Sequence, residues 1–310
     1  MKKPTPKIYR TTNWSSYNQA LIKRGNISIW FDPKTQWYAQ PQGKHGRNQT
    51  YSDTAIQCCL MIKSLFRLSL RMVTGFVQSL IKLCGLNWTA PDYSTLCRRQ
   101  KHIDIAISYQ KSRDGLHLLV DSTGLKFLGE GEWKRKKHQP EYRRQWRKLH
   151  IGIDAETLQI RAVQLTTNNV SDSQVLGDLL DQIPLDERID SVYTDGAYDT
   201  KCCRQVISDR QAHAVTPPRK NAKPWKDSKI SSIERNELLQ TVKHLGRTLW
   251  KKWSGYHRRS LVETKMHCIK LLGDKLMARS FPSQVNEIHA RVAVLNRFTE
   301  LGRPLTQVTP

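Results

Sequence analysis

The sequence predicts an α/β protein, with a mixed sheet of five strands flanked by helices and a helical domain before it. Two observations lead to this fold class. From residue 115 onward, short apolar runs bounded by turn residues alternate with amphipathic segments, in the order β-β-β-α-β-α-β-α. Three consecutive strands followed by alternating units describe a mixed sheet with helices on both faces. Before residue 111, apolar residues recur at helical spacing instead.

Length and charge limit the possible classes of protein. The 310 residues suffice for one large or two moderate domains. We expect an N-terminal arm over residues 1–50, a helical domain over 51–110 and the α/β domain over 115–300. Lysine and arginine number 51 against 27 acidic residues, a net charge of +24. Because cationic side chains that bind phosphates release condensed counterions, this charge predicts a polyanionic partner.

Two other classes of protein are disfavoured. Charged and polar residues interrupt the most apolar region, residues 56–86, so we expect no membrane span and no membrane partner. The chain has seven cysteines and no CxxC pair, which predicts reduced cytosolic thiols rather than a zinc site.

Residues 54–103 predict three short helices. The third, "YSTLCRRQKHI", carries Arg98, Arg99 and Lys101. Three helices with a basic last helix are typical of a helix-turn-helix-like DNA-binding domain. The alternative is a plain three-helix packing unit with a solvated last face. The basic character of the whole chain favours DNA binding.

Two aspartates stand out among the strands. Asp121 closes the first predicted strand, "LHLLVD", and Asp195 follows the fourth, in "YTDGAY". The strand order matches the ribonuclease-H-like fold, an analogy at the level of fold. In an open α/β sheet, sites form outside the ends of adjacent strands, so we expect the two aspartates to meet if their strands are neighbours. By contrast, Asp154 is interpreted as an exposed hairpin end and Asp172 as a helix-start residue.

A site for metal-assisted phosphoryl transfer needs a third carboxylate. Clustered carboxylates bind hard cations such as Mg²⁺, and two such ions can activate the attacking oxygen and stabilise the leaving one. The stretch "GYHRRSLVETKMHCIK" offers Glu263. On a helix of ~100° per residue that starts after Ser254 as N-cap, Tyr256, Arg259, Glu263 and Lys270 share an arc of ~60°. The alternative is a solvated amphipathic helix with an Arg259–Glu263 pair.

These three segments resemble a known family. The spacing Tyr256-x2-Arg259-x3-Glu263-x6-Lys270 resembles the signature of bacterial insertion-sequence DDE transposases. "VDSTGLKFLGEGEW" and "YTDGAYD" are similar to the surroundings of the first and second aspartates in the insertion-sequence-five family. The resemblance implies a ribonuclease-H-like catalytic domain in which Asp121, Asp195 and Glu263 are catalytic and bind metal. It also implies an N-terminal domain that binds terminal inverted repeats.

The resemblance further implies a mechanism and partners. We expect Mg²⁺, replaceable by Mn²⁺, to support cleavage of the 3′ ends and their direct transesterification into target DNA, with no covalent protein–DNA intermediate. Tyr256 contacts the DNA backbone in this interpretation, and Arg259 and Lys270 clamp phosphates. The partners are double-stranded DNA and at least a second copy of the chain on that DNA. The location is the bacterial cytoplasm, on the nucleoid.

Two basic segments predict further DNA contacts. Cations interleaved with aromatic residues, as in "EWKRKKHQPEYRRQWRK" (residues 132–148), are typical of backbone contact with stacking on unpaired bases. The alternative is a solvated hairpin. The predicted contacts in this segment are Trp133, Lys134, Arg135, Lys136, Lys137, Arg143, Arg144, Trp146, Arg147 and Lys148. The loop "PPRKNAKPWK" adds Arg219 and Lys220.

Two rival functions remain open at this point. A metal-dependent nuclease of the same fold would cut DNA but not join it. A DNA-binding regulator derived from a transposase would do neither, although the three intact carboxylates argue against this alternative.

Overall fold

The computed structural model describes residues 9–41, 43, 48–112, 114–129, 137 and 145–308. The chain divides into two compact units, Met1–Ser108 with Ala293–Pro310, and Tyr109–Val292. The sequence-based boundaries place residues 115–300 in one domain, whereas the structural division assigns the chain from Ala293 onward to the first unit. Within the described residues, no helix combines the length and apolar character that a membrane span requires.

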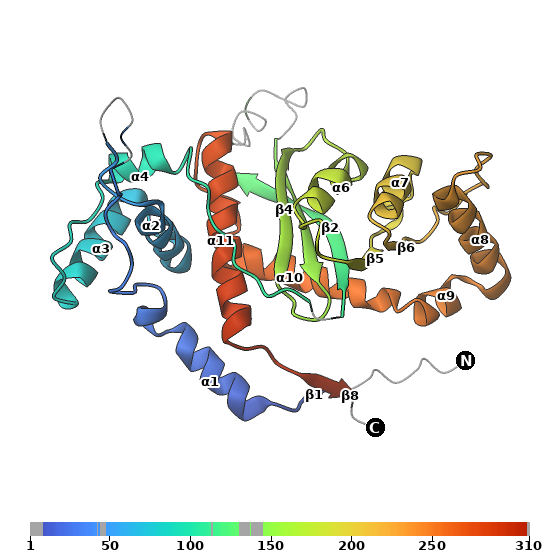
Figure 1. The fold of residues 1–310 in the computed structure, drawn as a ribbon, viewed down its shortest axis with the longest axis horizontal. Helices are drawn as coiled ribbons and strands as arrows, with labels where there is room; N and C mark the ends of the chain where they lie inside the picture. The colour runs from blue at the N-terminus through green and yellow to red at the C-terminus, as the bar shows by residue number, and fades with distance from the viewer. Residues whose placement is uncertain are drawn as a thin grey trace. The chain divides into compact units, whose positions relative to one another are not determined.

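The first unit is mainly helical. Its helices α2, α3 and α4 pack against one another (Figure 1). The side chains of Ser52, Ser69 and Asp92 cap these three helices by accepting from backbone N–H groups in their first turns. The elements of this unit are β1 (Tyr9–Thr11), α1 (Trp14–Arg24), η1 (Ile27–Ile29), α2 (Asp53–Phe66), α3 (Leu70–Leu83), α4 (Tyr93–Arg99), the last part of α11 (Phe281–Leu301) and β8 (Thr306–Val308), which pairs antiparallel with β1.

The second unit contains a mixed sheet in the order β4-β3-β2-β5-β6. Its strands are β2 (Leu116–Phe127), β3 (Arg147–Asp154), β4 (Ile160–Thr167), β5 (Ile189–Tyr193) and β6 (His213–Val215). The first three in sequence pair antiparallel, and β2, β5 and β6 pair parallel. This order, with the first strand in the centre, is ribonuclease-H-like. A sixth strand, β7 (Lys275–Leu276), pairs with the end of β2; two residues are too few for a detectable alternation.

Helices cover both faces of this sheet, because successive side chains of β2 point to opposite sides. Leu118 and Val120 pack against Val175 and Leu176 of α6. Asp121 and its face of β2 are directed toward the segment that leads into α10. The helical elements of the unit are α6 (Asp172–Asp181), η2 (Gly196–Tyr198), α7 (Lys201–Asp209), α8 (Ile230–Leu245), α9 (Arg247–Trp253), η3 (Tyr256–Arg259), α10 (Ser260–Leu271) and the first part of α11.

The prediction that Asp121 closes its strand was wrong, because β2 continues for six more residues. Pairing with β3 holds that extension in place as far as Leu125. The parallel pairing with β5, however, ends at Leu119↔Tyr193. Asp121 and Asp195 each lie two residues beyond that last pair, so they still meet where β2 and β5 separate.

Candidate active site

Asp121 lies on the face of β2 that faces η3, and its side chain is largely buried. Its Oδ1 accepts from the backbone N–H of Ser122 at 2.9 Å, and its Oδ2 accepts from Arg259 Nη2 at 2.6 Å. Burial raises the pKa of Asp121, while the Arg259 guanidinium acts in the opposite direction and the Asp195 carboxylate raises it further. Asp121 is therefore a desolvated acid whose charge depends on a nearby cation.

Asp195 lies directly after β5, where it caps the 3₁₀ turn η2. Its Oδ1 accepts from the backbone N–H of Ala197 at 2.8 Å. This local cap explains why an aspartate stands at the start of "DGAY". The other carboxylate oxygen, Oδ2, lies 4.0 Å from Arg259 Nη2. One oxygen of Asp195 thus holds the loop, and the other faces the site.

Glu263 reaches the same place from the first turn of α10. The expected single helix from Tyr256 does not form; η3 is a 3₁₀ turn, and α10 begins only at Ser260. Ser254, the expected N-cap, instead ends α9, and Gly255 turns the chain with a positive φ of 65°. The predicted shared face survives in part, since Arg259 and Glu263 remain one turn apart and pair at 3.0 Å.

Arg259 is the point on which the three predicted catalytic carboxylates converge. It donates to Asp121 and Glu263 and lies within 4.0 Å of Asp195. Burial by itself would lower the pKa of Arg259, but the carboxylates outweigh it and raise the pKa. Three carboxylates around one guanidinium leave a formal charge of −2 on the group.

Lys270 and Tyr256 flank this group. Lys270 Nζ donates to Thr123 Oγ1 at 2.7 Å, on the same face of β2 as Asp121. The Tyr256 ring lies 5.6 Å from the Trp250 ring and 5.3 Å from Lys251 Nζ. Burial raises the pKa of the Tyr256 phenol, so it is neutral at physiological pH.

The carboxylates suit a hard divalent cation by their chemistry, because such ions take carboxylate oxygens as ligands and the group carries surplus negative charge. As placed among the described residues, no three acidic, histidine or cysteine side chains form a ready metal cluster. Asp121, Asp195 and Glu263 instead surround Arg259. The donor set fits the implied metal, and the arginine lies where the donors meet.

Arg219, a predicted DNA contact, is directed toward the site loop. Its Nε donates to the carbonyl of Gly196 at 3.2 Å and its Nη2 to that of Ala197 at 3.0 Å. These carbonyls directly follow Asp195, so the arginine supports the loop that presents this carboxylate. The adjacent Lys220 is exposed. The sequence shows that the loop is basic but not where each cation points.

A buried ion cluster that the sequence interpretation missed anchors the same loop. Asp199 ends η2 and accepts from Arg204 Nε at 3.2 Å and Arg235 Nη2 at 3.1 Å. Its Oδ2 also accepts from the backbone N–H of Arg219 at 3.3 Å. The spacing of Asp199 to Arg204, on η2 and α7, is the only local signal; Arg235 comes from the distant α8.

Asp172 starts α6, as predicted, and also joins a polar group on the other face of β2. It accepts from Lys148 Nζ at 2.8 Å and from Ser122 Oγ at 2.9 Å, and His150 Nδ1 lies 3.7 Å away. Burial would raise the pKa of Asp172, but the contacts with Lys148 and Ser122 outweigh it and lower the pKa. Lys148, a predicted DNA contact, is thus engaged internally.

Asp154, which the sequence analysis interpreted as an exposed hairpin end, has different surroundings in the structure. Asp154 is fully buried rather than exposed. It accepts from Ser112 Oγ at 2.9 Å, Thr157 Oγ1 at 2.8 Å and the backbone N–H of Glu156 at 2.8 Å. A strand-end carboxylate satisfied by neighbouring donors is a turn-forming residue.

The remaining predicted DNA contacts have varied surroundings. Arg98 and Lys101 are exposed on and after α4, whereas Arg99 donates to the Tyr51 carbonyl at 2.9 Å and pairs with Asp53. Trp146 and Lys137 are exposed, and Arg147 donates to Gln284 at 2.8 Å and stacks over the Phe127 ring at 4.3 Å. The predicted contacts that lie outside the described residues are Trp133, Lys134, Arg135, Lys136, Arg143 and Arg144.

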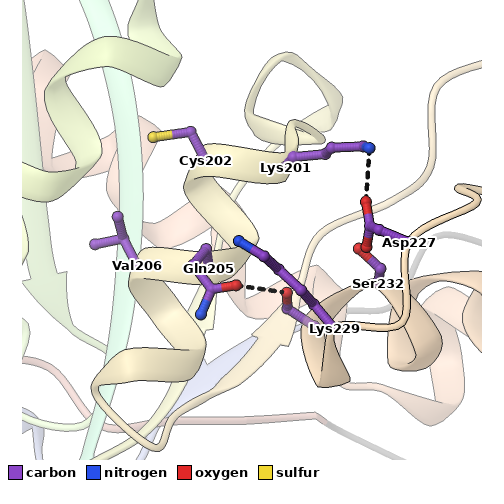
Figure 2. Close-up of a pocket in the computed structure, with 8 residues that line it drawn as sticks. Lys201, Cys202, Gln205, Val206, Asp227, Lys229 and Ser232 are labelled. Carbon is purple, nitrogen blue, oxygen red and sulfur yellow. Dashed lines mark hydrogen bonds and ion pairs between the residues drawn. The ribbon is translucent and has the colours of Figure 1, made fainter.

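A cavity of about 390 Å³ lies elsewhere, between α7 and the start of α8 (Figure 2). Lys201 Nζ pairs with Asp227 at its rim at 2.6 Å, and Ser231 Oγ donates to Gln205 at 3.3 Å. None of the three predicted catalytic carboxylates lines it. The carboxylate group lies instead where the central strands β2 and β5 separate.

A ribonuclease-H-like sheet with acidic residues where its central parallel strands separate is typical of a class of nucleic-acid-cleaving phosphoryl-transfer enzymes. Two family models, each described as a transposase DDE domain, match residues 22–130 and 112–297. The chain belongs to this DDE transposase family, with DNA as substrate and a transposase-type DNA-cutting activity.

Among solved structures, the chain is similar to one from the cryo-EM structure of the simian T-cell lymphotropic virus intasome in complex with PP2A regulatory subunit B56 gamma. The two are 16% identical, the match covers 67% of this chain and 72% of that one, and the TM-score is 0.24. The fold assignment rests on the strand order and not on this similarity.

Proposed function

We propose that the protein is the transposase of a bacterial insertion sequence of the insertion-sequence-five family. In this proposal it binds the terminal inverted repeats of its element, cleaves the 3′ ends and joins them to target DNA. The observation that carries the proposal is the convergence of Asp121, Asp195 and Glu263 on Arg259, where β2 and β5 separate. The Tyr-Arg-Glu-Lys spacing around Glu263 supports the finer family assignment.

The three carboxylates would hold Mg²⁺ or Mn²⁺. A divalent ion, when bound, supplies activation of the attacking oxygen and stabilisation of the leaving oxygen. Lys270 stands beside the group and would bind a phosphate as a point charge, and the neutral Tyr256 would donate a hydrogen bond to a phosphate oxygen. The loop contacts of Arg219 would keep Asp195 in place as DNA binds.

DNA recognition would involve the first unit. The capped helices α2, α3 and α4 support a helix-turn-helix-like role, with the exposed Arg98 and Lys101 directed to DNA. Arg99 would instead hold α4 to the start of α2 through Tyr51 and Asp53. Because two transposon ends must be joined together, we propose that the chain acts at least as a dimer on DNA, on the nucleoid in the bacterial cytoplasm.

The test uses the purified protein and a DNA fragment that carries the sequences flanking its gene. With Mg²⁺, the proposal predicts nicks at the 3′ ends of short inverted repeats, and transfer of a pre-cut end into plasmid DNA. Cutting without transfer would favour the nuclease alternative. Specific binding without cutting or transfer, under both Mg²⁺ and Mn²⁺, would favour the regulator.

A further inference from the structure

Arg259 occupies the position where a cation would be expected. Its Nη2 donates to Asp121 at 2.6 Å and lies 4.0 Å from Asp195, while its Nη1 donates to Glu263 at 3.0 Å. One guanidinium offsets one of three negative charges. The carboxylates are therefore gathered around a single positive group and remain under-neutralised.

Arg259 is not fully satisfied by hydrogen bonds in this position. Its Nε is buried, and no hydrogen-bond acceptor for it exists among the residues that the structure describes. A buried donor without a partner is unfavourable. The side chains of Asp195 and Glu263 are 38% and 61% exposed, so dissolved ions can reach their oxygens. The contact can exchange, unlike an ion pair that is closed to solvent.

The arginine and a divalent ion compete for the same oxygens. A divalent ion among the carboxylates would lie beside the guanidinium, and like charges at such a distance repel. A phosphodiester offers Arg259 another partner, because guanidinium binds phosphate through two parallel hydrogen bonds. Phosphate binding would thus release the carboxylates at the moment when the ion is needed.

We propose that Arg259 is an exchangeable counter-cation that couples DNA binding to divalent-cation binding. Without DNA it holds the three carboxylates together and competes with the ion. With DNA it transfers to a phosphate and leaves the carboxylates to the ion. The proposal rests on the proposed function for the identity of the phosphate, and it adds a role on the carboxylates to the expected role on DNA.

The first test measures Mn²⁺ binding to the DNA-free protein by electron paramagnetic resonance. Arg259→Gln is compared with Arg258→Gln, an exposed neighbour whose replacement changes the net charge equally. The proposal predicts that Arg259→Gln binds Mn²⁺ at least about fivefold more tightly than Arg258→Gln, within the usual range of coupling between sites. Equal or weaker binding by a folded Arg259→Gln would overturn it.

A second measurement needs no destabilised variant. The side-chain Nε resonance of Arg259 in the wild-type protein is followed by ¹⁵N NMR and identified by its loss in Arg259→Lys. Addition of Mg²⁺ with a random-sequence duplex is expected to shift this resonance more than Mg²⁺ alone. If the resonance stays in place under both conditions, Arg259 does not leave the carboxylates and the coupling does not exist.

Failure of this inference can be told apart from failure of the proposed function. If Asp195→Asn abolishes DNA cleavage while Arg259→Gln leaves Mn²⁺ affinity unchanged, the catalytic site stands and the coupling is rejected. If Asp195→Asn cleaves DNA normally, the proposed site is wrong whatever Arg259 does.

Discussion

Two arginine–carboxylate clusters, one containing Asp195 and the other Asp199, have opposite compositions. At the candidate active site, Arg259 meets the three carboxylates of Asp121, Asp195 and Glu263, and two of these side chains are more than a third exposed. In the other cluster, the single carboxylate of Asp199 lies between two arginines, and all three side chains are at most 3% exposed. The first cluster has a formal charge of −2 and the second of +1.

The difference separates a binding group from a structural one. The arginines around Asp199 come from α7 and α8, so their ion pairs fix the loop that contains Asp195 and Asp199 to two helices. Every side chain in that cluster is desolvated and has an ion-pair partner within the protein. The Asp121 cluster has surplus negative charge open to solvent, which a cation can neutralise. The net charge of an ion-pair cluster and its exposure to solvent therefore indicate whether it can bind a ligand.

The largest expected effect comes from removing a carboxylate of the solvent-exposed cluster around Arg259. Asp195→Asn removes a carboxylate that the metal would bind, so DNA cleavage and strand transfer should fall on the order of 1,000-fold or more, about 4 kcal/mol of activation free energy. Gel assays on end-labelled DNA measure this loss. The exposed Asp181→Asn serves as the matched control and should cleave normally. Near-normal cleavage by Asp195→Asn would mean that the surplus charge has no catalytic role.

Disruption of the buried cluster around Asp199 should lower the free energy of unfolding. Asp199→Ala leaves Arg204 and Arg235 buried without their carboxylate, and we expect the free energy of unfolding to drop by about 3–5 kcal/mol. Urea denaturation followed by circular dichroism measures it. Asp195→Asn should change stability by less than ~1 kcal/mol, because it relieves repulsion in an under-neutralised group. A similar loss in both variants would remove the distinction between the clusters.

A smaller, pH-dependent effect should come from His150, which lies beside Asp172 on the other face of β2. Burial lowers the pKa of His150 to about 4 from its ordinary value of 6.5, with Asp172 acting in the opposite direction. The unfolded chain therefore binds more protons than the folded chain between these values. The contribution of His150 to the free energy of unfolding is fully present above pH 6.5. It declines as the pH falls toward 4, by at most ~3 kcal/mol.

The corresponding measurement is urea denaturation at a series of pH values for the wild type and His150→Gln. The variant should lose most of the slope between pH 6.5 and pH 4. Mn²⁺ affinity at pH 7 should be unchanged, because His150 belongs to the other face of β2. An unaltered slope would show that other groups cause the acid sensitivity.

The smallest effect concerns the support of the Asp195 loop. Arg219→Ala removes two hydrogen bonds to loop carbonyls, so turnover at saturating DNA should fall about tenfold, with little change in unfolding free energy. Lys220→Ala, the exposed neighbour, should weaken DNA binding and leave turnover intact. Partial rescue by Arg219→Lys would support positioning. If Arg219→Ala affects only DNA affinity, the arginine is a DNA contact, as the sequence alone predicted.

Local pattern and chemistry determined much of this protein. Short apolar runs bounded by turn residues predict the strands, helical spacing of apolar residues predicts α2 to α4, and the predicted strand order leads to the ribonuclease-H-like sheet. Asp121, Asp195 and Glu263 could be selected from local patterns, a carboxylate at the end of a buried apolar run or one on a polar helix face, although β2 continues past Asp121. These features depend on neighbours in the chain, so the sequence contains them.

Only the tertiary structure decided where long side chains point and where elements stop. Pairing with β3 extends β2 past Asp121, and the turn at Gly255 replaces the expected first helical turn with η3. Arg219 and Lys148 look alike as cations in basic segments, yet one supports the Asp195 loop and the other pairs with Asp172. Such partners come from segments far apart in the chain, and long flexible cations adopt whichever direction the folded surroundings satisfy. For the same reason, the sequence placed Arg259 on the face of Glu263 but not among all three carboxylates.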